Sequence, residues 1–287
     1  MSDERKLQNK NTIEIIGKLA KTDLNVRTSK DGQDYISGTI TVESELDGSI
    51  NSFEISLYAK KVTQKGEISK LFSNYDSLRN YIGSKVRVNG SLREERFFNK
   101  TTSQLTSSQK LEGRFIAVEN ATTPDSATFE VSGFIRKPLT AKTNKKGEVY
   151  LYEIELGQAN YDESQLNCFK FHVDPTALEI LNGVQRIYTV NATVSFGGNI
   201  RYITSTTEVT QETGFGQART KVFTNTNKNY FITWGNDPIV DDTAYDGNAI
   251  IKLTQAYASR DVELTAGAGQ QTMGTTAPIT SRQSSLI

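Results

Sequence analysis

Apolar and polar residues alternate with a period of two along much of this 287-residue chain, as they do in strands with one buried face. Helical spacing replaces the alternation over residues 68–82, and Gly83 provides a helix stop. The polar stretch 93–110 is predicted to be a loop or hairpin. Together these features predict three strands, a helix and two strands, with the strands near residues 12–20, 34–42, 52–58, 85–92 and 114–120.

The same pattern occurs twice. Ile13-Glu-Ile-Ile-Gly17 is matched by Phe129-Glu-Val-Ser-Gly133, and Val86-Arg-Val-Asn89 is matched by Tyr188-Thr-Val-Asn191. Such self-similarity marks a duplicated supersecondary unit, so the function of one unit is expected to be the function of the chain. In the second copy we predict strands near 127–137, 148–157, 166–174, 185–196 and 229–236, a short helix over 175–181 and an extended hairpin within 197–228.

The element order is that of the OB-fold, a five-stranded Greek-key barrel. We therefore predict a mainly β protein of two tandem OB barrels, each with a short helix between its third and fourth strands. The first domain covers residues 11–121 and the second covers residues 127–260, with a short linker between them. Asp241 to Asp246 can cap a C-terminal helix over about residues 244–259, and the Gly/Ala/Gln/Thr/Ser-rich residues 261–287 are expected to form a flexible tail.

Composition narrows the classes of partner. The chain has 33 basic and 33 acidic residues, so it lacks the strong positive charge of a non-specific nucleic-acid coat, and any electrostatic argument must rest on local clusters. A single cysteine, Cys168, excludes an intrachain disulfide and fits a reducing cytoplasm. No apolar run approaches the ~18 residues of a membrane-spanning helix, and no hydrophobic signal core is present. We therefore expect a cytoplasmic protein without membrane contact.

Motifs for catalysis are absent from the sequence. It contains one histidine, His172, and no C-x-x-C, H-E-x-x-H, G-x-S-x-G or P-loop pattern. A triad around His172 stays open, but a solvated or ligand-facing strand residue is the simpler interpretation. The aspartates near residues 237–246 match no Ca²⁺ loop. We therefore predict that the protein is not an enzyme and needs no cofactor and no metal.

Basic and aromatic residues gather where an OB barrel binds its ligand, which is the face of strands 2 and 3 and the neighbouring loops. Flexible cations suit phosphates, and exposed rings stack on unpaired bases. In the first repeat the candidate nucleic-acid-binding residues are Arg27, Lys30, Tyr35, Tyr58, Lys60, Arg93, Arg96, Phe97, Phe98 and Lys100. In the second repeat they are Lys142, Lys145, Lys146, Tyr150, Lys170, Arg201, Tyr202, Phe215, Arg219, Lys221 and Phe223.

Other interpretations of these residues stay open. Tyr35 and Tyr150 can be half-buried strand-edge residues, and the lysine loops can be ordinary solvated turns. The adjacent rings of residues 97 and 98 can instead cover the barrel mouth or form a subunit contact. If Ile154 and Leu156 point inward, two acids, Glu153 and Glu155, line the binding face of the second barrel. The second repeat is therefore the weaker candidate.

The ordered set of motifs resembles the OB-fold single-stranded DNA-binding proteins, especially those of phages and mobile elements. The resemblance lies in Ile16-Gly-Lys-Leu19, in Phe53-Glu-Ile-Ser-Leu-Tyr-Ala-Lys60 and in Leu78-Arg-Asn-Tyr-Ile-Gly-Ser-Lys-Val-Arg-Val-Asn-Gly-Ser-Leu92. Tyr58 stands where that family has a base-stacking aromatic, whereas Ser52 stands where it often has a tryptophan. The family's acidic C-terminal tail is absent from residues 280–287.

The resemblance implies a function and a set of partners. It implies binding and protection of single-stranded DNA, without strong sequence preference, during phage DNA replication or recombination in the host cytoplasm. Replication or recombination proteins are the expected protein partners, and two barrels per chain fit a monomer or homodimer. The alternatives are a protein-interaction or virion structural module without nucleic-acid affinity, favoured by the balanced charge, and an RNA-binding protein.

Overall fold

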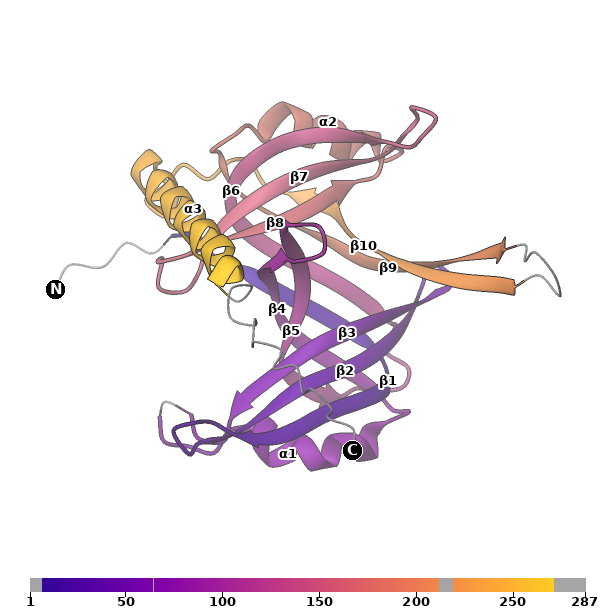
Figure 1. The fold of residues 1–287 in the computed structure, drawn as a ribbon. Coiled ribbons are helices and arrows are strands. Elements are labelled where there is room, and N and C mark those ends of the chain that lie inside the picture. The colour runs from indigo at the N-terminus through magenta and orange to yellow at the C-terminus, as the bar shows by residue number, and fades with distance from the viewer. Residues whose placement is uncertain (1–6, 64, 212–218, 271–287) are drawn as a thin grey trace, which may run out of the picture.

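The computed structural model describes residues 7–63, 65–211 and 219–270 (Figure 1). The strands in this part are β1 (Asn11–Thr28), β2 (Asp34–Leu46), β3 (Ser49–Lys60), β4 (Lys85–Asn99), β5 (Gln104–Val118), β6 (Ser126–Thr143), β7 (Val149–Ala159), β8 (Leu166–Val173), β9 (Thr193–Gln211) and β10 (Arg219–Gly235). The helices are α1 (Lys70–Leu78), α2 (Leu178–Ile187) and α3 (Gly247–Gln270), and a 3₁₀ turn over Arg79–Tyr81 follows α1.

The first five strands close into a barrel in the order β1-β2-β3-β5-β4, with β4 paired back to β1. Neighbouring strands are antiparallel except β3 and β5, which run parallel with Ile55 opposite Leu111. α1 comes between β3 and β4 in the chain, and its N-cap Ser69 accepts a hydrogen bond from the Phe72 amide. This connectivity is that of the OB-fold, so the predicted fold class is confirmed.

The last five strands repeat this arrangement in the order β6-β7-β8-β10-β9, with β6 also paired to β9. α2 stands between the third and fourth strands, but it covers Leu178–Ile187 rather than the predicted 175–181. The fourth strand consequently begins at Thr193 and not at residue 185. The prediction was wrong here because Leu181 and Val184 are spaced as in a helix and both are buried. Residues 185–196 were assigned to a strand from their alternation, and this assignment hid the end of the helix.

The two barrels meet edge to edge through their first strands. β1 pairs antiparallel with β6, from Asn11 opposite Val131 to Ile16 opposite Ser126. Figure 1 shows the first barrel below this seam and the second above it. Buried apolar residues of both barrels belong to one continuous cluster. The predicted domain limits, 11–121 and 127–260, stay a prediction, and the seam pairs the first strands of the two predicted domains.

Gly17 and Gly133 stand at matching positions in the two first strands, and each allows a close approach of another strand. A Cβ atom on Gly17 would lie 2.3 Å from the Glu43 carbonyl oxygen, and one on Gly133 would lie 2.3 Å from the Gly157 carbonyl oxygen. No side chain fits at such a distance, so only glycine is compatible with these tightly bent strands. The repeated glycine of the sequence therefore has a structural cause.

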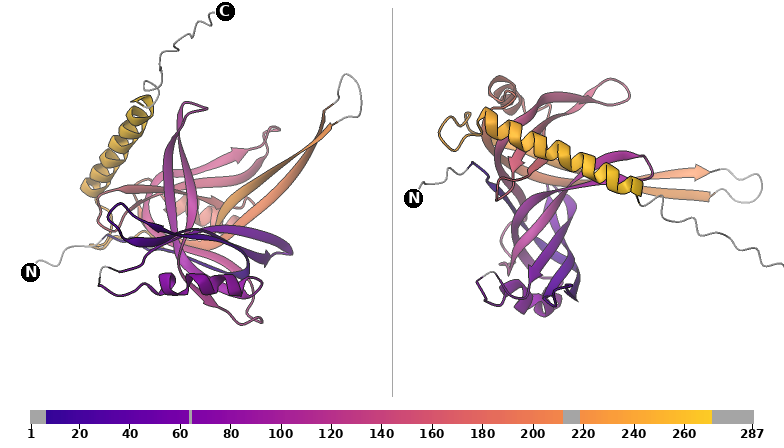
Figure 2. Two further views of the ribbon diagram at one scale, coloured as in Figure 1. Left: turned by 60° about the horizontal axis from the view of Figure 1, so that its bottom comes forward. Right: turned by 60° about the vertical axis from the view of Figure 1, so that its left-hand side comes forward.

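Two hairpins extend beyond the barrels (Figure 2). The β4–β5 hairpin is paired as far as Asn99 opposite Gln104, and the β9–β10 hairpin as far as Gln211 opposite Arg219. Both predicted hairpins are thus confirmed. The β9–β10 hairpin projects away from the barrels, to the right in Figure 1.

The C-terminal helix α3 is longer than the sequence predicts. It runs to Gln270, so residues 261–270 are helical and not part of a flexible tail. The cause is tertiary, because Leu253 and Tyr257 are buried against the second barrel and Asp261 pairs with Arg96 of β4. Residues 271–287 lie outside the described residues. No helix in the described part is long and apolar enough to cross a membrane.

Candidate nucleic-acid interface

Strand pairing gathers four of the predicted residues on the first barrel. Arg27 of β1 lies opposite Tyr35 of β2, and Tyr35 lies opposite Lys60 of β3. The Tyr58 ring lies 5.5 Å from the Tyr35 ring and is tilted by 41° to it, while 51% of Tyr58 is exposed. We call Arg27, Tyr35, Tyr58 and Lys60 the first-barrel patch. Two cations beside two accessible rings suit a ligand that offers both phosphates and unstacked bases.

The neighbouring acid, Asp34, forms no ion pair with the cations of this patch. Asp34 lies 3.0 Å from Lys61 Nζ and accepts a hydrogen bond from Thr28 at 3.1 Å. The hydrogen bond from Lys61 holds the pKa of the Asp34 carboxyl below its usual value. Among the described residues, Arg27 and Lys60 have no ion-pair partner. Lys30 is exposed on the adjacent turn, so it adds a third cation at the border of the patch.

The β4–β5 hairpin carries the other predicted residues of the first repeat. Arg93 and Lys100 are exposed, Phe97 is 40% exposed and Phe98 is half-buried. Because neighbouring strand residues point to opposite faces, Phe97 shares the outer face with Arg93, whereas Phe98 shares the other face with Arg96. The two adjacent rings therefore cannot both lie on one ligand surface.

Arg96 is not available to a ligand in the way the sequence predicts. Its guanidinium makes two hydrogen bonds to the Asp261 carboxylate of α3 and lies 4.6 Å from the centre of the Tyr257 ring. The hydrogen bond to Asp261 raises the pKa of Arg96, so the charge is permanent but already paired. The prediction was wrong because α3 lies far from β4 in the chain, and no local sequence pattern indicates that Asp261 pairs with Arg96.

On the second barrel, the face of β7 and β8 carries the two acids that the alternation predicts, Glu153 and Glu155, and both are paired. Burial alone would raise the pKa of Glu155, but hydrogen bonds from Lys137 and Arg136 outweigh burial and lower it. Glu153 lies 3.1 Å from Lys142 and 3.7 Å from Lys170. Two predicted cations of this repeat therefore neutralise an acid. Lys145, Lys146 and Tyr150 are exposed around the β6–β7 turn.

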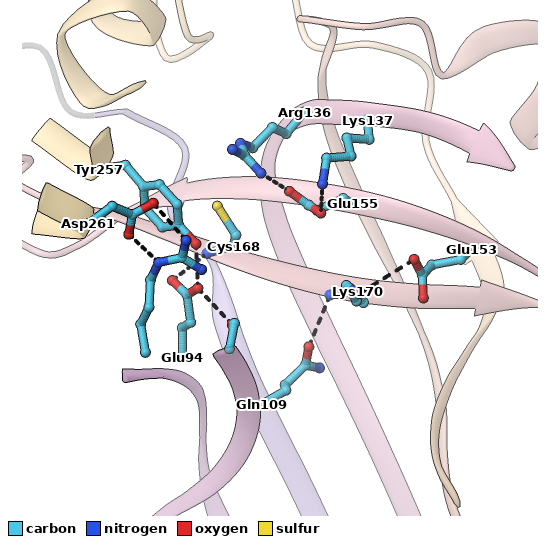
Figure 3. Close-up of polar contacts among 12 residues, drawn as sticks. Glu94, Gln109, Arg136, Lys137, Glu153, Glu155, Cys168, Lys170, Tyr257 and Asp261 are labelled. Atoms are coloured by element: carbon cyan, nitrogen blue, oxygen red, sulfur yellow. Dashed lines mark hydrogen bonds and ion pairs between the residues drawn. The ribbon is translucent and has the colours of Figure 1, made fainter. Parts of the chain in front are cut away.

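Parts of the chain far away in sequence cover this second face (Figure 3). Glu94 of β4 accepts hydrogen bonds from the Cys168 amide at 3.0 Å and from the Tyr257 hydroxyl at 2.7 Å. Gln109 of β5 accepts one from the Lys170 amide at 3.0 Å. The first barrel's hairpin and α3 are thus fastened to β8. The second barrel consequently presents less open surface on its strand 2–3 face than the first.

A cleft of about 730 Å³ remains between the hairpin, the second barrel and α3. His172 and Cys168 both line it. Burial lowers the pKa of His172 to about 4 and raises that of Cys168 to about 12, so the imidazole is uncharged and the thiol protonated at neutral pH. Within the described ranges, no three His, Cys, Asp or Glu side chains gather in a way that could hold a metal ion.

Tyr202 is a core residue and not an exposed stacking ring, which corrects the prediction. Only 3% of it is exposed, its ring lies 5.0 Å from that of Phe53, and its hydroxyl lies 2.9 Å from the Tyr230 hydroxyl. Burial raises the pKa of Tyr202 to about 12. The neighbouring Arg201 is paired with Asp47 of the first barrel at 2.9 Å. Position 202 therefore joins the barrels and offers no ring to a ligand.

Four predicted residues of the second repeat remain. Phe215 lies outside the described residues. Arg219, Lys221 and Phe223 lie in β10, but their side chains are not among those described, so their role in binding stays a prediction.

The sequence was compared with known protein families. The model of the YorF family matches residues 9–266. The chain belongs to the YorF family. A search of curated proteins found no match.

Solved structures similar to this YorF-family chain include the wild-type single-stranded DNA-binding protein from Thermus aquaticus. The TM-score is 0.51 with 11% sequence identity, over 84% of this chain and 98% of that chain. A deletion mutant of the same Thermus protein also gives a TM-score of 0.51, with 12% identity over 82% of this chain and 97% of that chain. At such low identity the likeness concerns the fold, which agrees with the two OB barrels described above.

The sequence-based prediction of binding residues missed several cations of this YorF-family chain. Lys110 of β5, Lys137 of β6 and Lys228 of β10 all line the cleft between the barrels. Lys110 could have been found, because it precedes the inward-facing Leu111 and must point outward by strand alternation. Lys228 carried no comparable signal, since its place in the cleft depends on how the second barrel packs against the first.

Proposed function

We propose that this YorF-family protein binds single-stranded DNA without strong sequence preference and that the first-barrel patch is its main contact surface. The observation that carries the proposal is the register that sets Arg27, Tyr35 and Lys60 in one row, with the exposed Tyr58 ring beside them. The OB fold shared with the Thermus single-stranded DNA-binding protein supports it. The cations would hold the sugar-phosphate backbone while unpaired bases stack on Tyr58.

Binding of this kind keeps a strand unpaired and protected without chemical change to it. The low pKa of His172 makes its imidazole a weak base, and the raised pKa of Cys168 leaves its thiol protonated at neutral pH, so these two side chains of the cleft fit a binding protein better than an enzyme. Service in phage DNA replication or recombination, in the cytoplasm of the host, rests on the motif resemblance. A monomer or a homodimer would supply enough surface, since each chain carries two barrels.

The test is fluorescence anisotropy of the purified protein with a labelled dT oligomer of about 35 nucleotides, against a duplex of equal length at two salt concentrations. We expect binding to the single strand only, and weaker binding at the higher salt because neutralised phosphates release counterions. A matched RNA oligomer separates an RNA binder from a DNA binder, since only RNA offers the 2′-hydroxyl. Absence of binding at low salt would overturn the proposal and leave the barrels as an assembly module.

A further inference from the structure

Positively charged side chains from several strands line the cleft between the barrels. Three acids line it, and each is paired, Asp261 with Arg96, Glu155 with Arg136 and Lys137, and Glu153 with Lys142 and Lys170. Six cations line the same space: Arg96, Lys110, Arg136, Lys137, Lys170 and Lys228. The lining therefore has more positive than negative groups, although the chain as a whole is neutral.

Among the cations of the cleft, Lys228 has the least compensation of its charge by acidic side chains. Its ammonium lies 5.1 Å from the centre of the Tyr202 ring, and no ion pair joins it to another described residue. Burial lowers the pKa of Lys228, and the nearby Lys110 lowers it further, whereas Glu54 opposes them. Lys110 has an acidic neighbour, Glu95 at 3.6 Å, and an anion between Lys110 and Lys228 would reduce the repulsion between the two ammonium groups.

The wall beside these lysines also has unused hydrogen-bonding capacity. Ser108 and Gln109 line the cleft. Within the described part of the chain, Ser108 Oγ is a buried atom without a hydrogen-bond partner, whereas the Gln109 side chain interacts with the Tyr230 hydroxyl. A hydroxyl group is a donor that suits the oxygens of a phosphate.

The outer face of the first barrel leads from the first-barrel patch to this cleft. On that face Ser56 of β3 lies opposite Glu112 of β5, and the inward-facing Ile55 next to it lies opposite Leu111. Lys110 is thus about four residues along the sheet from the level of Tyr58, roughly 13 Å at the rise of a strand. One extended DNA single strand could contact both the first-barrel patch and the cleft.

We propose that the cleft between the barrels is a second phosphate-binding site, in which Lys110 and Lys228 hold the backbone of the same single strand that stacks on the first-barrel patch. The proposal rests on the proposed function and adds a path for the ligand. It places contacts from both barrels on one strand, even though the strand 2–3 face of the second barrel is largely covered.

The test compares two double variants that each remove two positive charges. Lys110→Gln with Lys228→Gln changes the cleft, and Lys70→Gln with Lys252→Gln changes two exposed lysines of α1 and α3. The salt dependence of dT binding is measured for both and for the wild type. If each cleft lysine contacts one phosphate, the slope of log K against log salt becomes about 1.4 units shallower, at ~0.7 per phosphate of a single strand. The affinity at low salt should fall about tenfold in the cleft variant only.

A second measurement on the unmodified protein does not depend on how the variants fold. Lysine acetylation with and without bound dT, read by mass spectrometry, should show protection of Lys110 and Lys228 but not of Lys70 or Lys252. Wild-type binding with equal acetylation and unchanged slopes would overturn the cleft site while leaving the proposed function standing. No binding of dT by the wild type would instead overturn the proposed function itself.

Discussion

Tyr58 is the residue on which base stacking depends most in the proposed site. Its ring packs against Tyr35 yet stays half exposed, so one face is held in place while the other is free. Stacking of a base on such a ring contributes about 1–3 kcal/mol. We therefore expect Tyr58→Ala to weaken dT binding by about tenfold, as measured by anisotropy.

The matched control is Tyr161→Ala, because Tyr161 is 95% exposed on the turn between β7 and β8. This variant should bind dT as the wild type does. Equal affinities for all three proteins would remove Tyr58 from the site.

His172 makes the stability of the fold depend on pH. Its Nδ1 accepts a hydrogen bond from the Tyr230 amide at 3.2 Å, and burial lowers its pKa to about 4 although Glu153 favours the charged form. An unfolded histidine has a pKa of about 6.5, so the unfolded state takes up the proton first as the pH falls. The free energy of unfolding should therefore decrease between pH 6.5 and 4, by up to about 3 kcal/mol from this group.

The measurement is urea unfolding at pH 7, 6 and 5 for the wild type and His172→Asn, whose amide oxygen can still accept the Tyr230 hydrogen bond. The substitution should flatten the decrease between pH 6.5 and 5. Parallel pH profiles for the two proteins would show that this imidazole is not held uncharged by burial.

At the scale of elements, the two faces of the β4–β5 hairpin have different surroundings. Phe97 shares the outer face with Arg93, whereas Phe98 faces the side that packs toward the second barrel. We expect the double variant Phe97→Ala with Phe98→Ala to weaken dT binding at least tenfold while the fold remains intact by circular dichroism.

The single variants divide this effect. Phe97→Ala should account for most of the lost affinity, and Phe98→Ala should mainly lower the free energy of unfolding because its ring is half-buried. Unchanged affinity of the double variant would exclude the hairpin tip from the interface.

The helix α3 is fastened to the hairpin through a buried carboxylate. Glu94 is 4% exposed and accepts hydrogen bonds from the Tyr257 hydroxyl, the Ser107 hydroxyl and the Cys168 amide. Tyr257→Phe removes one donor from a buried acid, which should cost about 1–3 kcal/mol of stability. Tyr150→Phe, at an exposed ring, is the control in urea unfolding. Equal stability of the two variants would mean that the contact contributes nothing.

At the scale of the whole molecule, the β1–β6 seam and the shared core predict that both barrels unfold together. The only tryptophan, Trp234, lies in the second barrel, so its fluorescence reports on that barrel. Ile55 is fully buried in the first, and Ile55→Ala should destabilise that barrel by about 2–5 kcal/mol. If the barrels are coupled, the Trp234 transition in urea shifts to lower concentration together with the circular dichroism signal.

A Trp234 transition that stays in place while part of the circular dichroism signal shifts would show two independently folding domains. That result would agree with the predicted limits 11–121 and 127–260 as true domain boundaries.

The fold class could be predicted from the sequence because strand alternation and glycine positions are local properties. The side chains of residues 36, 40 and 42 must share one face of a strand whatever lies beyond it, and Gly17 and Gly133 mark the same bend in both copies. The patch residues Arg27, Tyr35, Tyr58 and Lys60 were found for the same reason, since a regular hairpin register brings them together.

What covers each face was decided only by the tertiary structure. Arg96 and Tyr202 have the alternation of exposed strand residues, yet Arg96 is paired with Asp261, 165 positions away, and Tyr202 is buried beside Phe53 of the other barrel. Lys228 gains its place near Lys110 through the same packing. Alternation reports which way a side chain points, whereas pairing and burial depend on contacts between distant segments, and no local pattern encodes those contacts.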